Sequence, residues 1–170
     1  MPAERITPMN QPSTRPAKKV ADSRTEQNYI IMPAHINGYN RLFGGQLVEW
    51  IDIVAGIVAR RHCESNITTV AIDNLRFKAP AHVNDLIVLM GQVTYVGRTS
   101  MEVRVQTYVE DLSGMRKLIN RAYIVMVAID ENERPIEVPQ IIPETPEEKF
   151  EYECGAKRDA LRRQRRTEAY

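Results

Sequence analysis

Residues 44–63 decide the fold, and they read GGQLVEWIDIVAGIVARRHC. The apolar side chains of this stretch recur three and four residues apart, as on one face of a helix: Leu47, Trp50, Ile51, Val54, Ala55 and Val58. We therefore predict one long amphipathic helix that begins at Gly44 and ends at about His62. We expect it to be the main helix of the protein.

The residues after this helix predict strands. Four segments are rich in β-branched and aromatic residues and are separated by turn residues: 67–77, 85–96, 101–109 and 118–129. In 101–109 apolar and polar residues alternate, which predicts an antiparallel strand with one face in water. A short strand is expected at 29–32, before a polar loop. One long apolar helix followed by four strands predicts an α+β fold in which a curved antiparallel sheet wraps around the helix.

The two ends of the chain are predicted to lie outside this core. Residues 1–25 carry four prolines among Ser, Thr, Lys and Arg and predict a loose, disordered tail. Near the other end, TPEE at 145–148 predicts the start of a second, more exposed helix. We therefore expect a folded domain at 26–143 and a helical extension at 144–170.

The last turns of the second helix are basic. They contain four arginines: Arg162, Arg163, Arg165 and Arg166. Cations at a helix C-terminus complement its dipole and need no ligand to explain them. Nucleic-acid binding is the alternative, and the balanced charge of the whole chain makes it the weaker one.

The composition is that of one compact domain. With 170 residues, 43% hydrophobic and 26% charged, the chain fits neither intrinsic disorder nor a membrane protein. Its formal net charge of +1 provides no long-range field for nucleic acid or an anionic membrane. The longest apolar run, 122–129, is too short to span a bilayer, and no apolar signal segment opens the chain. We expect a cytoplasmic protein without nucleic-acid or membrane partners.

Asp52 lies within the apolar helix rather than at one of its ends. The residues stacked above it at i+3, i+4 and i+7 are all small: Ala55, Gly56 and Ala59. A glycine in mid-helix costs about 1 kcal/mol relative to alanine, so Gly56 predicts that another backbone or a ligand approaches closely beside the carboxylate. The alternative is a solvated carboxylate on the polar edge of the helix.

Two features that precede Asp52 could share its chemistry. Gly44 and Gly45 present backbone N–H groups at the positive end of the helix dipole, where they can stabilise an oxyanion or simply form a tight turn. Asn37, in the preceding loop, can donate to a carbonyl or accept from a water, although loop asparagines are also turn formers.

The spacing of these groups predicts a shared site. Asp52 follows Gly44 by eight residues, which is about 12 Å along a helix. A reacting carbon must lie about 3 Å from both the attacking oxygen and the oxyanion donors. If these groups act together, Asn37 and Gly44 of one subunit face Asp52 of a second. We therefore expect at least a twofold homodimer with two equivalent sites.

The histidines and cysteines do not form a recognisable catalytic or metal-binding pattern. His35 could reach a substrate or be exposed and idle. His62 and Cys63 point about 100° apart on the helix, so they cannot form a thiolate–imidazole pair, and we expect them to pack at its end. With His82 and Cys154 included, no metal-ligand spacing is present, and we predict no metal site.

Several motifs combine over about residues 28–160: Asn37, LFGG at 42–45, WID at 50–52, VAGIVARRHC at 54–63, VPQ at 138–140 and PET at 143–145. In this combination the sequence resembles the hot-dog acyl-CoA thioesterases, the family of brain-type acyl-CoA hydrolases and their bacterial single-domain relatives. The resemblance implies a hot-dog fold, with one long helix wrapped by a curved antiparallel sheet. It also implies dimers that place the active site at the subunit interface.

The activity that the resemblance implies is hydrolysis of an acyl-CoA thioester to a free fatty acid and CoA. At the matching positions, Asp52 is the general base or, alternatively, the nucleophile, Asn37 is its amide partner, and Gly44 and Gly45 supply the oxyanion hole. Phe43 stands where some members have a histidine, so no role of that side chain carries over. Brain-type members can carry two hot-dog units, and here a homodimer or a homohexamer of three dimers would replace the second unit.

The phosphates of an acyl-CoA substrate require local positive charge. Lys78, Arg98 and Ser100, at strand ends and in a turn, are the candidate CoA-binding residues, and the alternative is that they are ordinary solvated turn residues. CoA belongs to the substrate and product, so no separate cofactor is expected.

Two other hot-dog functions compete with hydrolysis. A non-catalytic acyl-CoA-binding sensor or regulatory module would lack the acid, whereas Asp52 is present, and the first 25 residues show no helical period for a fused DNA-binding segment. A hydratase acting on enoyl-CoA would need an aspartate and a histidine close together, for which only His35 is available.

Overall fold

The computed structural model describes residues 14–168. Its elements in chain order are β1 (Lys18–Lys19), α1 (Val20–Ser23), β2 (Thr25–Ile30), a 3-10 turn η1 (Pro33–His35), α2 (Gly44–Cys63), β3 (Asn66–Phe77), β4 (Leu86–Val96), β5 (Ser100–Glu110), β6 (Arg116–Ile129), β7 (Ile141–Ile142) and α3 (Pro146–Thr167).

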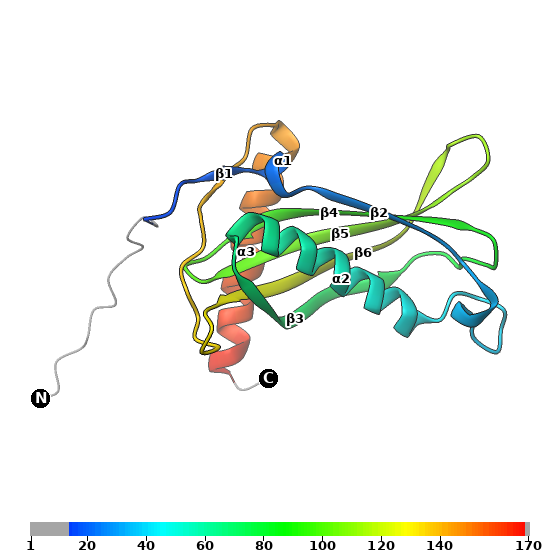
Figure 1. The fold of residues 1–170 in the computed structure, drawn as a ribbon, viewed down its shortest axis with the longest axis horizontal. Helices are drawn as coiled ribbons and strands as arrows, with labels where there is room; N and C mark the ends of the chain where they lie inside the picture. Colours follow the sequence, from blue (N-terminus) through cyan, green and yellow to red (C-terminus); the bar gives the residue numbers. More distant parts are fainter. Residues whose placement is uncertain (1–13, 169–170) are drawn as a thin grey trace, which may run out of the picture.

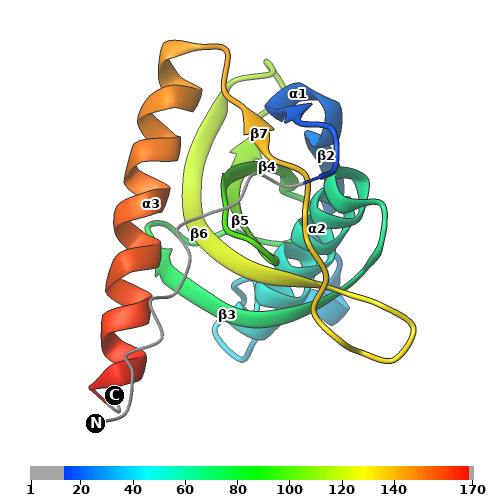
Figure 2. The same cartoon turned by 90° about the vertical axis from the view of Figure 1, so that its left-hand side faces the viewer.

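Five strands form one antiparallel sheet in the order β2-β4-β5-β6-β3, so β3 and β2 are its edges. The sheet curves around α2 (Figure 1), and the view along its strands shows α2 on the concave side (Figure 2). The predicted α+β hot-dog arrangement is confirmed. The main helix begins at Gly44 as predicted and ends at Cys63, whereas the first sheet strand lies at 25–30 rather than 29–32.

The inner face of the sheet is apolar. Ile51, Val54 and Val58 of α2 are completely buried. Gly91 of β4 permits a close approach, because a Cβ at this position would lie 2.8 Å from Val54 and 2.9 Å from Val58. The helix therefore packs directly on the backbone of β4, as its apolar stripe predicts.

The outer face of the sheet is covered as well, by α3 (Figure 2). Glu102 and Arg104 of β5, which the alternation predicted to face water, are only 1% and 6% exposed. Gly155 brings the helix close, because a Cβ there would lie 2.5 Å from the Cβ of Tyr95. The prediction of a solvated outer face is wrong, because α3 covers these polar side chains with polar side chains of its own. The prediction of a second, more exposed helix is confirmed, since four residues of α3 are buried, compared with nine of α2.

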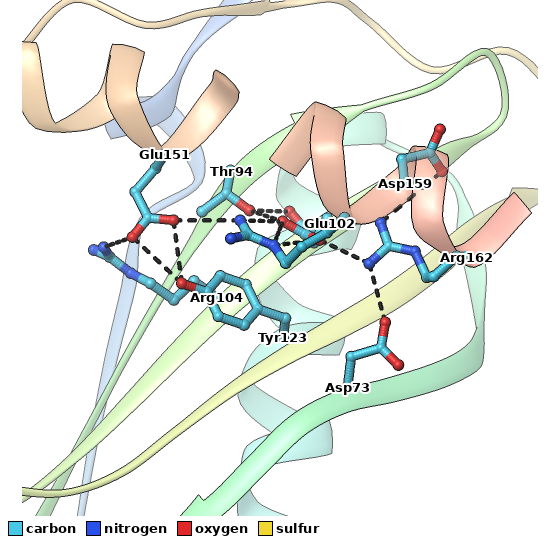
Figure 3. A network of polar contacts seen from close by, with 9 residues as sticks. Asp73, Thr94, Glu102, Arg104, Tyr123, Glu151, Asp159 and Arg162 are labelled. Carbon is cyan, nitrogen blue, oxygen red and sulfur yellow. Dashed lines mark hydrogen bonds and ion pairs between the residues drawn. The ribbon is translucent and has the colours of Figure 1, made fainter. Parts of the chain in front are cut away.

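Ion pairs connect α3 to this outer face (Figure 3). Arg158 donates through Nη2 to Glu102 Oε1 at 2.8 Å and through Nε to Oε2 at 3.1 Å. Arg162 donates to Glu102 at 2.9 Å and to Asp73 of β3 at 3.1 Å. The helix dipole is therefore not a sufficient explanation of Arg162, since its guanidinium group joins α3 to two strands.

The N-terminal segment corrects the predicted domain boundary. Of the expected tail at 1–25, residues 1–13 lie outside the described residues. Residues 18–25, however, belong to the fold: β1 pairs in parallel with β7, and Val20 of α1 is 2% exposed. The tail prediction is wrong for 18–25, because burial of Val20 and pairing with β7 compensate for the cost of ordering this segment.

The start of α3 confirms the predicted capping box. The Thr145 hydroxyl accepts from the N–H of Glu148 at 3.1 Å, and the Glu148 carboxylate accepts from the N–H of Thr145 at 3.1 Å. Within residues 14–168, no helix is both long enough and apolar enough to cross a membrane.

Candidate functional site

The N-terminus of α2 is left without a side-chain cap. Phe43 is the N-cap residue, no side chain among residues 14–168 accepts from the first N–H groups, and the first turn contains no acidic residue. A Cβ on Gly45 would lie 2.5 Å from the ring of Phe43, which is 55% exposed and would have to turn aside. Gly44 lies against Phe77, whose ring would be 3.4 Å from a Cβ there. The positive end of the helix dipole is thus available to an external acceptor.

Asn37 holds the loop in front of this helix. Its Oδ1 accepts from the backbone N–H groups of Tyr39 at 3.0 Å and Arg41 at 3.3 Å. No hydrogen bond of its Nδ2 is found within residues 14–168. The structure therefore confirms the turn-forming role of Asn37, and it leaves the amide NH₂ as a donor.

Three of the predicted site residues share one pocket, which we call the α2 N-terminal pocket. Asn37, Gly44 and Lys78 line this hollow of about 430 Å³ together with Arg41 and apolar residues. Gly45 and Asp52 are not among its lining residues. One protomer thus brings the amide, the helix N-terminus and a cation together, and it leaves the carboxylate outside.

In the described part of the chain, the Asp52 carboxylate accepts one side-chain hydrogen bond. Thr69 of β3 donates through Oγ1 to Asp52 Oδ1 at 2.7 Å. The carboxylate is partly buried and lies on the face of α2 that points toward the edge strand. Because one oxygen is held, the other remains available to a substrate or a water.

The surface around Asp52 is apolar and open. Ile53 is 43% exposed and Val70 of β3 is 54% exposed. A Cβ on Gly56 would meet only Ile67, at an ordinary 3.7 Å. Nothing within the described residues therefore requires a glycine at position 56, as would be expected if the approaching group came from outside the protomer.

The predicted CoA-binding residues are split between two places. Lys78 lies in the α2 N-terminal pocket, whereas Arg98 and Ser100 line a second hollow of about 760 Å³ on the outer face of the sheet. We call this hollow the α3 basic pocket, and its charged lining residues are Arg98, Asp73, Asp159, Arg162, Arg163, Arg165 and Arg166.

The histidines have structural roles. Nδ1 of His35 accepts from the N–H of Met32 at 3.1 Å, and the ring meets Trp50 edge-on at 5.1 Å. His62 is buried, with Nε2 2.9 Å from the carbonyl of Pro139. Burial lowers the pKa of His62, against the opposing effect of that hydrogen bond. No cluster of metal-ligating side chains occurs within residues 14–168.

Thr69 is the functional candidate that sequence reasoning missed. The signal was present, because Thr69 shares a strand face with Ile67, and residues i and i+2 of a strand point the same way. The sequence does not show how β3 is placed along α2. It therefore could not predict that Thr69 faces Asp52 and not a residue in another turn of the helix.

The comparisons with known proteins agree with this architecture. The family model "Thioesterase superfamily" matches residues 39–114. An uncharacterized acyl-CoA thioester hydrolase of Bacillus subtilis is 36% identical over 159 residues, which cover 93% of this chain and 91% of the relative. The human cytosolic acyl coenzyme A thioester hydrolase is 31% identical, and the match covers 80% of this chain but only 37% of that longer protein.

Solved structures show the same fold. The acyl-CoA hydrolase of Bacillus cereus matches with a TM-score of 0.85 at 32% identity, covering 90% of this chain and 94% of that one. The acyl-CoA hydrolase of Staphylococcus aureus, solved with butyryl coenzyme A and coenzyme A, matches with a TM-score of 0.86 at 32% identity, covering 91% and 94%. The chain therefore belongs to the hot-dog acyl-CoA thioester hydrolases of the thioesterase superfamily.

Proposed function

We propose that this protein hydrolyses an acyl-CoA thioester to a free fatty acid and CoA. The observation that carries the proposal is the accessible carboxylate of Asp52, held by Thr69 at 2.7 Å in the middle of a core helix. The names of the family members, and the butyryl-CoA complex of the Staphylococcus aureus enzyme, support this substrate class.

Variants of the Staphylococcus aureus enzyme support the residue assignment. Structures exist in which alanine replaces an asparagine, an aspartate or a threonine of that protein. Along its chain these positions are 15 and 17 residues apart. Asn37, Asp52 and Thr69 have the same spacing here.

In the proposed mechanism Asp52 acts as general base on water. The hydrogen bond from Thr69 orients the carboxylate, so that its free oxygen accepts a proton from the attacking water. The water oxygen forms the new bond to the thioester carbon, and CoA leaves as a thiolate. A thiolate is a good leaving group, so this step needs no strong general acid. Direct attack by Asp52, through an anhydride, is the alternative.

The oxyanion is stabilised at the start of α2. We assign this role to the N–H groups of Gly44 and Gly45, because no side chain caps them and the helix dipole favours negative charge there. The Nδ2 of Asn37 donates to the thioester carbonyl in this scheme, since its Oδ1 is engaged by the loop backbone. Lys78 lines the same pocket and could pair with a phosphate of CoA.

We propose that two protomers complete each site. Asn37 and Gly44 line a pocket that Asp52 does not reach in the same chain. The unpaired edge of β3 and the exposed side chains of Ile53 and Val70 form a surface on which a second copy can pack. One solved relative, with a TM-score of 0.84 and 39% identity, is a hexameric acyl-CoA thioesterase, and it supports an assembly of three such dimers.

Release of free CoA thiol, followed with a disulfide reagent across acyl-CoAs of increasing length, tests the activity. Asp52→Asn and Asn37→Ala should each reduce turnover by about a hundredfold or more without loss of fold. Glu49→Gln, an exposed carboxylate on the same helix, is the matched control and should retain activity. Full activity in both site variants would contradict the assignment, and absence of any thiol release would favour the sensor alternative.

Mixing the two inactive variants tests the shared site. In a dimer that contains one Asp52→Asn chain and one Asn37→Ala chain, one of the two sites is intact. After random exchange of subunits, activity should recover to about a quarter of the wild-type value. No recovery, despite exchange shown by mass spectrometry, would place both residues in a site within one chain.

A further inference from the structure

Phe77 forms one side of the α2 N-terminal pocket. It is the last residue of the edge strand β3, and its apolar ring is 55% exposed. Three atoms of the ring, Cζ, Cε1 and Cε2, lie 3.4, 3.8 and 4.0 Å from the position of a Cβ on Gly44. The distal edge of the ring therefore stands directly against the first residue of α2.

The backbone on both sides of this ring is held in place. Phe77 is the register partner of Asn120 on β6, and Asn120 is completely buried. The Nδ2 of Asn120 donates to the carbonyl of Arg76 at 2.9 Å, and the N–H of Lys78 donates to the carbonyl of Ile119 at 2.8 Å. The ring therefore projects from a defined backbone position, although much of its own surface is open.

Phe77 is the only aromatic side chain among the described residues that line the pocket. The three lining residues that follow Lys78 carry small or cyclic side chains: Ala79, Pro80 and Ala81. A phenyl ring is rigid and fills more space than any of these groups. The free width of the pocket beside the start of α2 therefore depends on Phe77 more than on the segment that follows it.

The proposed mechanism places the thioester carbonyl at this point. A carbonyl oxygen that accepts from the N–H of Gly44 lies about 3 Å from the amide nitrogen. The next carbon of the acyl chain, the α-carbon, is bonded to the carbonyl carbon and so falls beside the Phe77 ring. A straight chain has only hydrogens and one chain carbon at this position, whereas an α-branched chain adds a methyl group that needs the space of the ring.

We infer that Phe77 is a specificity-determining residue that favours straight-chain over α-branched acyl groups. The inference rests on the proposed function, because it needs the thioester carbonyl at the start of α2. A second protomer that packed on the exposed ring would give Phe77 a role in assembly instead. Its removal would then change dimerisation and not the choice of substrate.

Butyryl-CoA and isobutyryl-CoA test the inference, because their acyl groups are isomers that differ only in the branch at the α-carbon. Wild type should hydrolyse butyryl-CoA with a kcat/KM at least about tenfold higher. Phe77→Ala should bring this ratio close to about one, and Phe77→Leu, which keeps part of the bulk, should give an intermediate ratio. Phe150→Ala is the matched control, since it removes a ring that is 63% exposed on α3, and it should keep the wild-type ratio.

Two results would overturn the inference. One is equal hydrolysis of the two isomers by wild type, and the other is a Phe77→Ala or Phe77→Leu variant that keeps the wild-type ratio. Size-exclusion chromatography with light scattering shows whether these variants still dimerise. Loss of the dimer in Phe77→Ala, together with an unchanged ratio in Phe77→Leu, would assign the ring to subunit packing.

Asp52→Asn separates this inference from the proposed function. Isothermal titration calorimetry of this variant measures the dissociation constants of both isomers without turnover. Binding should favour butyryl-CoA, and the preference should disappear when Phe77→Ala is added. A preference in binding without hydrolysis by wild type would contradict the proposed function alone, whereas hydrolysis without any preference would contradict the role of Phe77 alone.

Discussion

The sheet of this protein is covered on both faces, but by opposite chemistry. On the inner face, α2 buries a continuous apolar stripe that includes Ile51 and Val54. On the outer face, α3 buries charged residues, and Glu102 of β5 is 1% exposed beneath two arginines. Both helices lie close to the sheet because each contact has a glycine, Gly91 inside and Gly155 outside.

The difference separates two ways of attaching a helix. Apolar packing is nondirectional and tolerates small shifts, whereas a buried ion pair is stable only when both partners and their hydrogen bonds are in place. We therefore expect the inner face to supply most of the folding free energy. The outer face should determine where α3 sits, and with it the shape of the α3 basic pocket.

The largest effect is expected on the outer face. Glu102→Ala removes the buried carboxylate that Arg158 and Arg162 share, and it should lower the free energy of unfolding by about 3–5 kcal/mol. Urea denaturation measures this change. Glu147→Ala removes a partner of Arg104 whose side chain is 70% exposed, so it should cost less than about 1 kcal/mol. Equal effects of the two variants would show that burial of the pair does not matter.

A core truncation measures how much apolar packing on the inner face contributes to the free energy of unfolding. Ile51→Ala deletes a side chain that is fully buried and should cost about 2–5 kcal/mol, because it removes apolar contacts and leaves a cavity. The same denaturation curves measure it. This loss should be insensitive to salt, since no charge is involved, and a strong salt dependence would argue against the distinction between the two faces.

The close approach of α3 can be tested at a single methyl group. Gly155→Ala places a Cβ at 2.5 Å from Tyr95, so it should destabilise the protein by about 1–3 kcal/mol despite the better helix propensity of alanine. Gly38→Ala is the control, because no atom lies within 4 Å of a Cβ there. A stabilising Gly155→Ala variant would mean that α3 moves away from the sheet at little cost.

The smallest effect concerns pH at the end of α2. Burial lowers the pKa of His62 in the folded protein, so the unfolded chain binds its proton first as the pH falls. The stability that depends on neutral His62 is therefore complete above pH about 6.5 and is lost below it, by up to about 1.4 kcal/mol per pH unit until the folded pKa is reached. Thermal unfolding between pH 7.5 and 5 should show a weaker dependence for His62→Gln than for wild type.

Periodicity predicted the inner face correctly and the outer face incorrectly for the same reason. An apolar stripe can only be stable when it is covered, so the pattern of Leu47, Trp50 and Ile51 implies burial. A polar strand face is compatible with water or with a covering helix of complementary charge. Glu102 and Arg104 therefore carried no sign in the sequence that α3 would bury them.

The candidate site divides in the same way. Asn37, Gly44 and Asp52 were predicted from residue type and helix position. The rise per residue of a helix also predicted that the carboxylate lies too far from the glycines to share a site within one chain. Thr69 depended on strand register, and the α3 basic pocket depended on how a helix end and a distant turn meet. Such long-range juxtapositions leave no local pattern.

Local patterns were enough to predict the elements of this protein: the apolar period of α2, the alternation of its strands and the capping box at Thr145 all act within a few residues. Which polar groups become buried and which become partners, as Glu102 with Arg158 or Asp52 with Thr69, depends on the packed fold. The cost of burying a charge depends on groups far away in the chain, whereas the hydrophobic gain of an apolar face is already present in its own residues.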